Sequence, residues 1–271
     1  VVGVVADRMD RRHIARAALG LELACALALA GLAAAGSTLL WPLFAVAVAL
    51  GVARAFAAPS LSALAPNLVP PAVLPTAIAW NSIGWQSGAV LGPVVGGLSY
   101  DLATPAPYAL AAVLLVAAIA ALFRIPPVAL PPSSGAKGVA AVKEGLEYVR
   151  GNRIVFGAIS LDMFAVILAG ATAMLPIYAR DILMVGPAEL GQLRAAPAVG
   201  AAAVAFWLTR NPLGSRVGQK MFVNVGLFAL ATVGFGLSGL LWVSLGCLVV
   251  MGAADMVSVY VRSSLIQLHT P

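Results

Sequence analysis

The sequence predicts an all-α fold, a polytopic bundle of membrane-spanning helices. Hydrophobic residues make up 62% of the 271 positions and charged residues only 10%, whereas a soluble domain is about 45–50% apolar and about 25% charged. Eight apolar stretches are long enough to cross a bilayer, which takes roughly 20 residues per helix. The basic residues also gather in alternate breaks between these stretches. The net charge of +6 therefore indicates membrane topology rather than nucleic-acid binding.

The eight predicted spans follow one another with short polar breaks between most of them. Residues 1–6 resemble the last turn of an earlier span. The stretch 188–209 has the weakest signal because it contains Glu189, Arg194 and Pro197. The eight spans are residues 15–36, 39–61, 76–100, 105–124, 154–179, 188–209, 220–238 and 240–267.

One break is much longer than the others and divides the chain. Residues 125–153 begin with a proline-rich run and continue into a segment in which Val139, Val142, Leu146 and Val149 recur at helical spacing. This pattern is typical of a linker followed by an amphipathic surface helix. We therefore expect an N-terminal bundle over 1–124, a linker over 125–153 and a C-terminal bundle over 154–271.

The charges of the breaks predict the orientation in the membrane. Residues 7–16, 124–153 and 210–220 hold 12 of the 16 lysines and arginines, and the eight-span count puts all three breaks on one side. Since basic loops remain in the cytoplasm, we expect the loop 125–153 to be cytoplasmic and the protein to lie in the plasma (inner) membrane. Because the span count places the three basic breaks on one side, the charge distribution and the span count support each other.

A weak internal repeat relates the two bundles. Gly51-Val-Ala-Arg54 matches Gly252-Ala-Ala-Asp255, and further identities follow at the same offset of 201 residues. Repeated halves are common among secondary transporters.

The N-terminal segment carries a first family resemblance. It resembles the loop between helices 2 and 3 of the major facilitator superfamily, although an aspartate stands where the superfamily usually has glycine. The resemblance implies a cluster of charges that latches the cytoplasmic face, since a carboxylate beside guanidiniums can form bidentate pairs. A loop that only sets topology is the alternative. The predicted gating motif consists of Gly3, Asp7, Arg8, Asp10, Arg11 and Arg12.

A second resemblance lies in the third complete span. Three glycines at i, i+4 and i+8 predict a smooth groove for a neighbouring helix, and the proline permits a bend. The run resembles the G-x-x-x-G-P-x-x-G-G motif of the fifth helix of exporters and antiporters in that superfamily. A generic packing motif is the alternative. The predicted exporter motif consists of Gly88, Gly92, Pro93, Gly96 and Gly97.

Five charged residues at membrane depth are candidates for proton coupling or substrate contact, because burying a charge in lipid is costly. Arg54 resembles the basic residue of the fourth helix in the superfamily, but it could also reach the headgroups. Asp255 and Arg262 are two turns apart on one helix and could serve packing. Glu22 and Asp162 are the other two of the five candidates.

Segments around Leu175–Asp181, Gly191–Gly200 and Arg262–Pro271 resemble the enterobactin-exporter branch of the superfamily. That resemblance implies a two-bundle fold truncated at both ends, extending from the end of helix 2 to helix 10.

The function predicted from these features is proton-coupled export of a small molecule by alternating access, by a monomer in the lipid bilayer. An ATP-driven permease subunit and a membrane-embedded enzyme are the alternatives. The sequence contains no catalytic cluster, zinc spacing or phosphate loop, so no catalytic residue, metal or cofactor is expected. The resemblance to the enterobactin-exporter branch implies a siderophore or a drug as the substrate.

Overall fold

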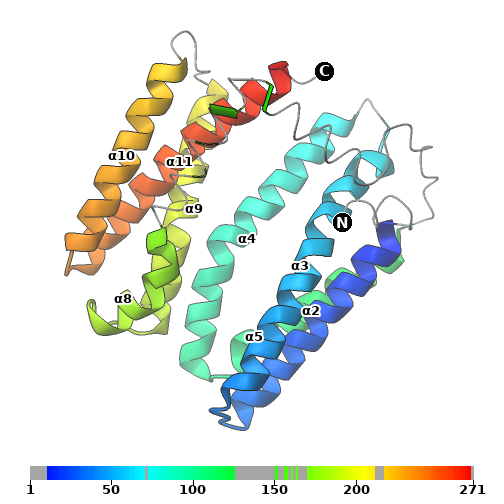
Figure 1. Cartoon of the computed structure of the whole chain (residues 1–271). Helices are drawn as coiled ribbons and strands as arrows, with labels where there is room; N and C mark the ends of the chain where they lie inside the picture. Colours follow the sequence, from blue (N-terminus) through cyan, green and yellow to red (C-terminus); the bar gives the residue numbers. More distant parts are fainter. Residues whose placement is uncertain are drawn as a thin grey trace. The chain divides into compact units, whose positions relative to one another are not determined.

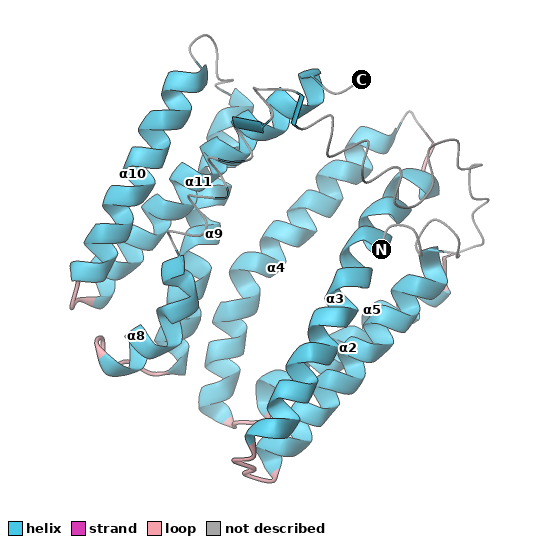
Figure 2. Ribbon diagram, viewed as in Figure 1, coloured by secondary structure: helices cyan, strands magenta, loops and turns pink. Residues whose placement is uncertain are grey.

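The computed structural model describes residues 11–70, 73–125, 170–210 and 217–269, together with isolated positions between 150 and 163. Across these residues the regular structure is helical, without strands (Figure 2). The chain divides into two compact units. The first unit is Val1–Trp85 with Leu102–Val142, and the second is Gln86–Asp101 with Lys143–Pro271.

The first unit is built around helix α2 (Arg11–Ala34). Helix α3 (Leu40–Leu68) and helix α5 (Ala106–Phe123) both pack against it. Helix α4 (Leu74–Leu102) contributes its first half to this unit. The buried side chains between the packed helices are Ala15, Leu19, Leu64 and Leu122.

Helix α2 ends in a turn that needs a glycine. Gly36 adopts a left-handed φ of 60°, which side chains with a Cβ rarely tolerate. The amide of Ser37 then donates to the carbonyl of Leu32 (3.0 Å) and that of Gly36 to Ala33 (3.2 Å). These two bonds satisfy carbonyls that the helix end would leave unpaired.

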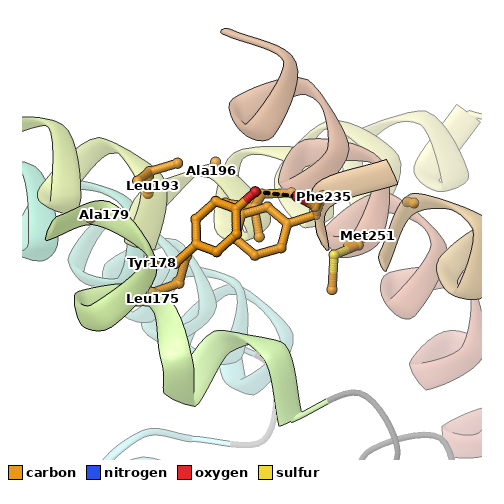
Figure 3. Packing of buried hydrophobic residues seen from close by; sticks show 9 residues of the cluster. Leu175, Tyr178, Ala179, Leu193, Ala196, Phe235 and Met251 are labelled. Atoms are coloured by element: carbon orange, nitrogen blue, oxygen red, sulfur yellow. Dashed lines mark hydrogen bonds between the residues drawn. The ribbon is translucent and has the colours of Figure 1, made fainter. Parts of the chain in front are cut away.

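Among the described residues, the second unit contains the other half of α4 together with the helices α8, α9, α10 and α11, which Figure 1 labels. Helix α11 (Leu241–His269) packs against both α9 (Pro187–Arg210) and α10 (Val217–Leu237). The short helix α8 (Leu175–Asp181) follows a 3₁₀ segment, η2 (Gly170–Met174), and packs on α9. Nine buried residues of α8, α9, α10 and α11 form the largest core cluster, seven of which Figure 3 labels.

Seven helices agree in position with predicted spans, whereas the described end of the remaining span, residues 170–179, is divided between η2 and the start of α8. Helices α2, α3, α4, α5, α9, α10 and α11 overlap seven of the eight predicted stretches. Five of them are long and apolar enough to cross a membrane: residues 12–34, 40–61, 106–123, 218–237 and 241–261. The prediction of a polytopic all-α membrane protein is therefore confirmed. In the predicted span 154–179, residues 154–155, 158–159, 161–162 and 164–169 lie outside the described residues, as does the linker apart from residues 125, 150 and 151.

Helix α9 continues through the proline that weakened its signal in the sequence. Pro197 lies inside the helix, where it removes one backbone hydrogen bond. The small residues around it let two neighbouring helices approach the α9 backbone. Contacts with the neighbouring helices therefore stabilise α9 in addition to its own hydrophobicity.

Candidate functional site

The predicted gating motif is described only at its end. Gly3, Asp7, Arg8 and Asp10 lie outside the described residues, and Arg11 belongs to α2 without a described side chain. Arg12 is 8% exposed, and its Nη1 donates to the carbonyl of Ile125 (3.2 Å). The part of the motif that is visible thus contacts the carboxyl end of α5.

A second arginine, not identified from the sequence as a site residue, joins Arg12 there. Arg16 lies one turn further along α2, and its Nη2 donates to the carbonyl of Leu122 (2.9 Å). Its guanidinium carbon also lies 4.4 Å from the centre of the Phe123 ring. Arg12 and Arg16 are four residues apart, so they lie on the same face of a helix. In the sequence, this spacing could have indicated that the two side chains bind the same neighbouring element.

The predicted exporter motif lies on α4, with Pro93 inside the helix. A Cβ built on Gly97 would lie 3.2 Å from the Cα of Gly191 on α9 and would collide with the carbonyl of Pro187. A Cβ on Gly191 would in turn collide with the carbonyl of Pro93. The described contact of the motif with α9 is therefore made by Pro93 and Gly97, which approach Gly191. Among the described residues, nothing lies within 4 Å of a Cβ at Gly88, Gly92 or Gly96.

Helix α9 makes an equally close contact with α11. A Cβ on Gly200 would collide with the carbonyl of Val249, and one on Gly252 with the carbonyl of Pro197. Gly191 and Gly200 are nine residues apart, so at about 100° per residue they point to opposite sides of the helix. Helix α9 therefore contacts α4 on one side and α11 on the other through backbone-to-backbone approaches.

A polar contact strengthens the α4–α9 approach. The Nε2 of Gln86 donates to the carbonyl of Ala198 (2.7 Å), directly after Pro197. The carbonyl of Ala198 accepts this bond on the same helix that Gly97 approaches, so a side-chain donor is added to the backbone contact. Gln86 was not identified from the sequence.

The charged candidates at membrane depth that the structure describes lie on three different helices. Glu22 is half-buried on α2, Arg54 is exposed on α3 and Asp255 is exposed on α11. Within the described part of the first unit, no acid forms an ion pair with Arg54. Asp162 lies outside the described residues, as does the side chain of Arg262.

The second unit also contains a buried polar network that joins α8 to α10. Tyr178, 8% exposed, directs its hydroxyl at the carbonyls of Phe235 (2.6 Å) and Ser238, and its ring packs on Phe235 with the centroids 4.4 Å apart (Figure 3). The Oγ of Ser244 in turn lies 3.2 Å from the Oγ of Ser238. This network holds α8 to the carboxyl end of α10.

The end of α8 carries an exposed ion pair. Arg180 Nε donates to Asp181 Oδ1 (2.6 Å), and Nη2 to Oδ2 (3.2 Å). These hydrogen bonds from Arg180 lower the pKa of Asp181 below its usual value, because they favour the charged form. Solvent screening at so exposed a position leaves little effect on stability.

The family model of the Major Facilitator Superfamily matches the chain over residues 1–271. The chain belongs to the major facilitator superfamily. As a member of this superfamily it is an integral membrane protein and a secondary transporter, not an enzyme.

Solved structures share the facilitator fold with this chain. A bacterial homologue of the iron transporter ferroportin, in an inward-facing state, is 18% identical, with a TM-score of 0.58 over 98% of this chain and 70% of the other. A bacterial metal transporter is 16% identical, with a TM-score of 0.56 over 100% of this chain and 74% of the other. No curated protein matches the sequence. At these identities the comparison supports the facilitator fold and leaves the substrate open.

Proposed function

We propose that this facilitator is a proton-coupled exporter of a small organic molecule, working by alternating access in the plasma membrane. The observation that carries the proposal is the exposed carboxylate of Asp255 on α11, a helix long and apolar enough to span the bilayer. The two halves of the chain, 1–124 and 154–271, rock about a central site in this mechanism.

The environment of Asp255 favours a role in transport over a role in packing. Its neighbours Ala254 (1% exposed), Val257 (8%) and Ser258 (7%) are buried, whereas Asp255 itself points away from them. A charge facing lipid at mid-membrane costs about 2.5–3.5 kcal/mol. An exposed carboxylate there is stable when it faces water, and on this ground we propose that Asp255 lines a water-filled transport pathway and exchanges protons with it. Asp162, Glu22, Arg54 and Arg262 remain candidates for the same pathway.

The direction of transport rests on the α4 motif. The exporter-type run over 88–97 is in backbone contact with α9 through Gly97 and Gly191, and Gln86 adds a hydrogen bond to that contact. The run resembles the motif of the fifth helix in exporters and antiporters of the superfamily, and we therefore propose export as the direction of transport. We propose that Asp7, Arg8, Asp10 and Arg11 act with Arg12 as the cytoplasmic latch.

The substrate class is proposed from the sequence resemblance and from the side chains that the structure describes. Both solved relatives are described as metal transporters or homologues of one. Among the described residues, however, no group of three or more His, Cys, Asp or Glu side chains could hold a metal ion together. We therefore propose an organic substrate, either a siderophore or a drug-like compound.

The test is efflux from cells that lack their own major exporters and express the intact protein. A panel of siderophores and drugs is screened for retention, and any efflux is challenged separately with an uncoupler and by ATP depletion. Proton-coupled export predicts that the uncoupler abolishes efflux while ATP depletion alone does not. Efflux that stops only with ATP would contradict the proposal.

Asp255→Asn tests the residue behind the proposal. The amide cannot titrate, so we expect the pH dependence of efflux to flatten, while Asp255→Glu retains it. Glu189→Gln is the matched control, because the Glu189 carboxylate accepts the amide of Gly186 (3.1 Å) and has a local structural role. An unchanged pH profile in Asp255→Asn would assign proton coupling to another acid, for which Asp162→Asn is the next variant.

A further inference from the structure

The carboxyl end of α5 is held by side chains that come from α2. Carbonyls in the last turn of a helix have no partner within the helix, and the helix dipole makes this end negative. Arg16 donates to Leu122 (2.9 Å) and Arg12 donates to Ile125 (3.2 Å). Two positive side chains thus serve carbonyls at the end of a different helix, more than 100 residues away in sequence.

Apolar packing and a ring contact complete the junction. Leu122 is buried against Ala15 and Leu19, with Ile119 and Ile125 packed around them. The Arg16 guanidinium stacks 4.4 Å from the Phe123 ring centre, a geometry that a planar guanidinium makes and an ammonium makes less well. The Nε of Arg16 is buried and has no hydrogen-bond partner among the described residues, while Nη2 of the same side chain makes the bond to Leu122.

We propose that Arg12 and Arg16 are positioning residues that join the gating motif to the start of the linker between the two halves. Arg12 belongs to the motif, and Ile125 is the first residue of the linker predicted from the sequence. Through the two arginines, the amino end of α2 and the carboxyl end of α5 move as one body. The inference rests on the proposed alternating-access function, in which that body moves relative to the second half.

Hydrogen exchange on the intact protein in lipid nanodiscs tests the junction itself. In Arg16→Gln we expect the amides of residues 121–125 to exchange about tenfold faster, since a hydrogen bond from a charged donor is lost. Arg16→Lys keeps the charge but loses the planar stack, and should fall between Arg16→Gln and the wild type. Unchanged exchange in Arg16→Gln would overturn the proposal.

Arg210→Gln is the matched control for that experiment. Its guanidinium also stacks on a phenylalanine, Phe206, at 4.0 Å, but the pair lies within one helix, α9. Losing it should leave the exchange of residues 121–125 as in the wild type. If Arg210→Gln accelerates that segment as Arg16→Gln does, the effect is a general loosening and the proposal is wrong.

Spin-label distances separate this proposal from the proposed function. Labels on Ala17 and Gln219 report the amino end of α2 against α10, and labels on Arg124 and Gln219 report the end of α5 against the same point. All three positions are exposed, and the native Cys25 and Cys247 are replaced by alanine. In the otherwise wild-type protein, both distances should change together between acidic and neutral pH.

The spin-label experiment distinguishes a failure of alternating access from a failure of the proposed junction between α2 and α5. If the Ala17–Gln219 distance takes one value at every pH, alternating access is contradicted, while the exchange data still decide on the junction. In Arg16→Gln we expect the Ala17 pair to keep its two distances and the Arg124 pair to broaden and lose its correlation with pH. If the Arg124 pair still follows the Ala17 pair, Arg16 does not position α5.

Discussion

At the residue scale, Tyr178 shows how one hydroxyl can join two helices. Its ring is buried on Phe235, and its oxygen lies between two carbonyls at the end of α10. A phenol suits this position because an apolar body and a polar tip are both needed. Neither the spacing nor the hydrophobicity of the sequence indicated this pairing, since its partner carbonyls are 57 and 60 residues away.

Tyr178→Phe should destabilise the protein by about 1–3 kcal/mol, because buried carbonyls lose their donor while the ring stays in place. Thermal unfolding of the detergent-solubilised protein measures the change as a lower Tm. Tyr100→Phe is the control, as Tyr100 is 40% exposed and its hydroxyl can reach solvent or the membrane interface. Equal Tm values for the two variants would show that the Tyr178 hydrogen bond has no net effect on stability.

Met184 is a residue in a backbone conformation that suits glycine. Its φ is 54° and its side chain is 81% exposed, while Val185 donates its amide back to the carbonyl of Ala179 (3.0 Å). The left-handed conformation costs roughly 1–2 kcal/mol for a residue with a Cβ. At the end of α2 the same left-handed conformation is adopted by a glycine, Gly36, as expected.

Met184→Gly should therefore stabilise the protein, by less than about 1 kcal/mol after the entropy of the added glycine is counted. The Tm of the variant is compared with that of Met174→Gly, in which the same exchange is made at an ordinary φ of −87°. Met174→Gly should lower the Tm. A lower Tm in both variants would show that the Met184 side chain contributes more than its backbone costs.

At the scale of the helices, small residues decide which surfaces meet. Lipid provides no hydrophobic drive for helices to associate, so close backbone approach matters more than in water. Helix α9 has glycines on opposite sides, and each side touches another helix through backbone atoms. The exporter motif of α4 participates through Pro93 and Gly97 rather than through the glycines at i, i+4 and i+8, Gly88, Gly92 and Gly96.

Gly200→Ala and Gly252→Ala should each disrupt the α9–α11 packing, because the added methyl group meets carbonyl oxygens that cannot move aside. Overpacking of this kind costs about 1–3 kcal/mol or more. Gly246→Ala on α11 is the control, since nothing described lies within 4 Å of its Cβ; there alanine should be neutral or favourable in a helix. Solubilised yield and Tm give the comparison, and an unaffected Gly200→Ala variant would contradict the close approach.

At the scale of the whole molecule, the prediction concerns orientation. The charge pattern puts residue 140 on the cytoplasmic side and residue 185 on the other, because basic breaks remain inside. Reporter tags inserted near these two positions of the intact protein should therefore appear in different compartments. Both tags in the same compartment would mean that the span count between them is wrong, and the orientation used above would have to be changed.

The sequence by itself determined the fold class and most helix positions. Long apolar runs cannot be solvated by water, and a helix is the structure that satisfies its own backbone in lipid, so the predicted spans reappear as α2–α5 and α9–α11. The superfamily could also be recognised from short local patterns around Asp7 and Gly92. Such features depend on residues close in sequence, and local physics is sufficient for them.

Contacts between distant residues were decided only by the tertiary structure. Arg16 looks like one more basic residue of a loop until α5 ends beside it, and Gln86 and Gly191 look unremarkable until α4 and α9 approach. In a membrane helix nearly every surface is apolar, so hydrophobicity does not distinguish a face that packs from one that meets lipid. Which faces meet depends on the shape of the backbone surface and on a few hydrogen-bond donors. The partners of these groups are known only when the helices are assembled.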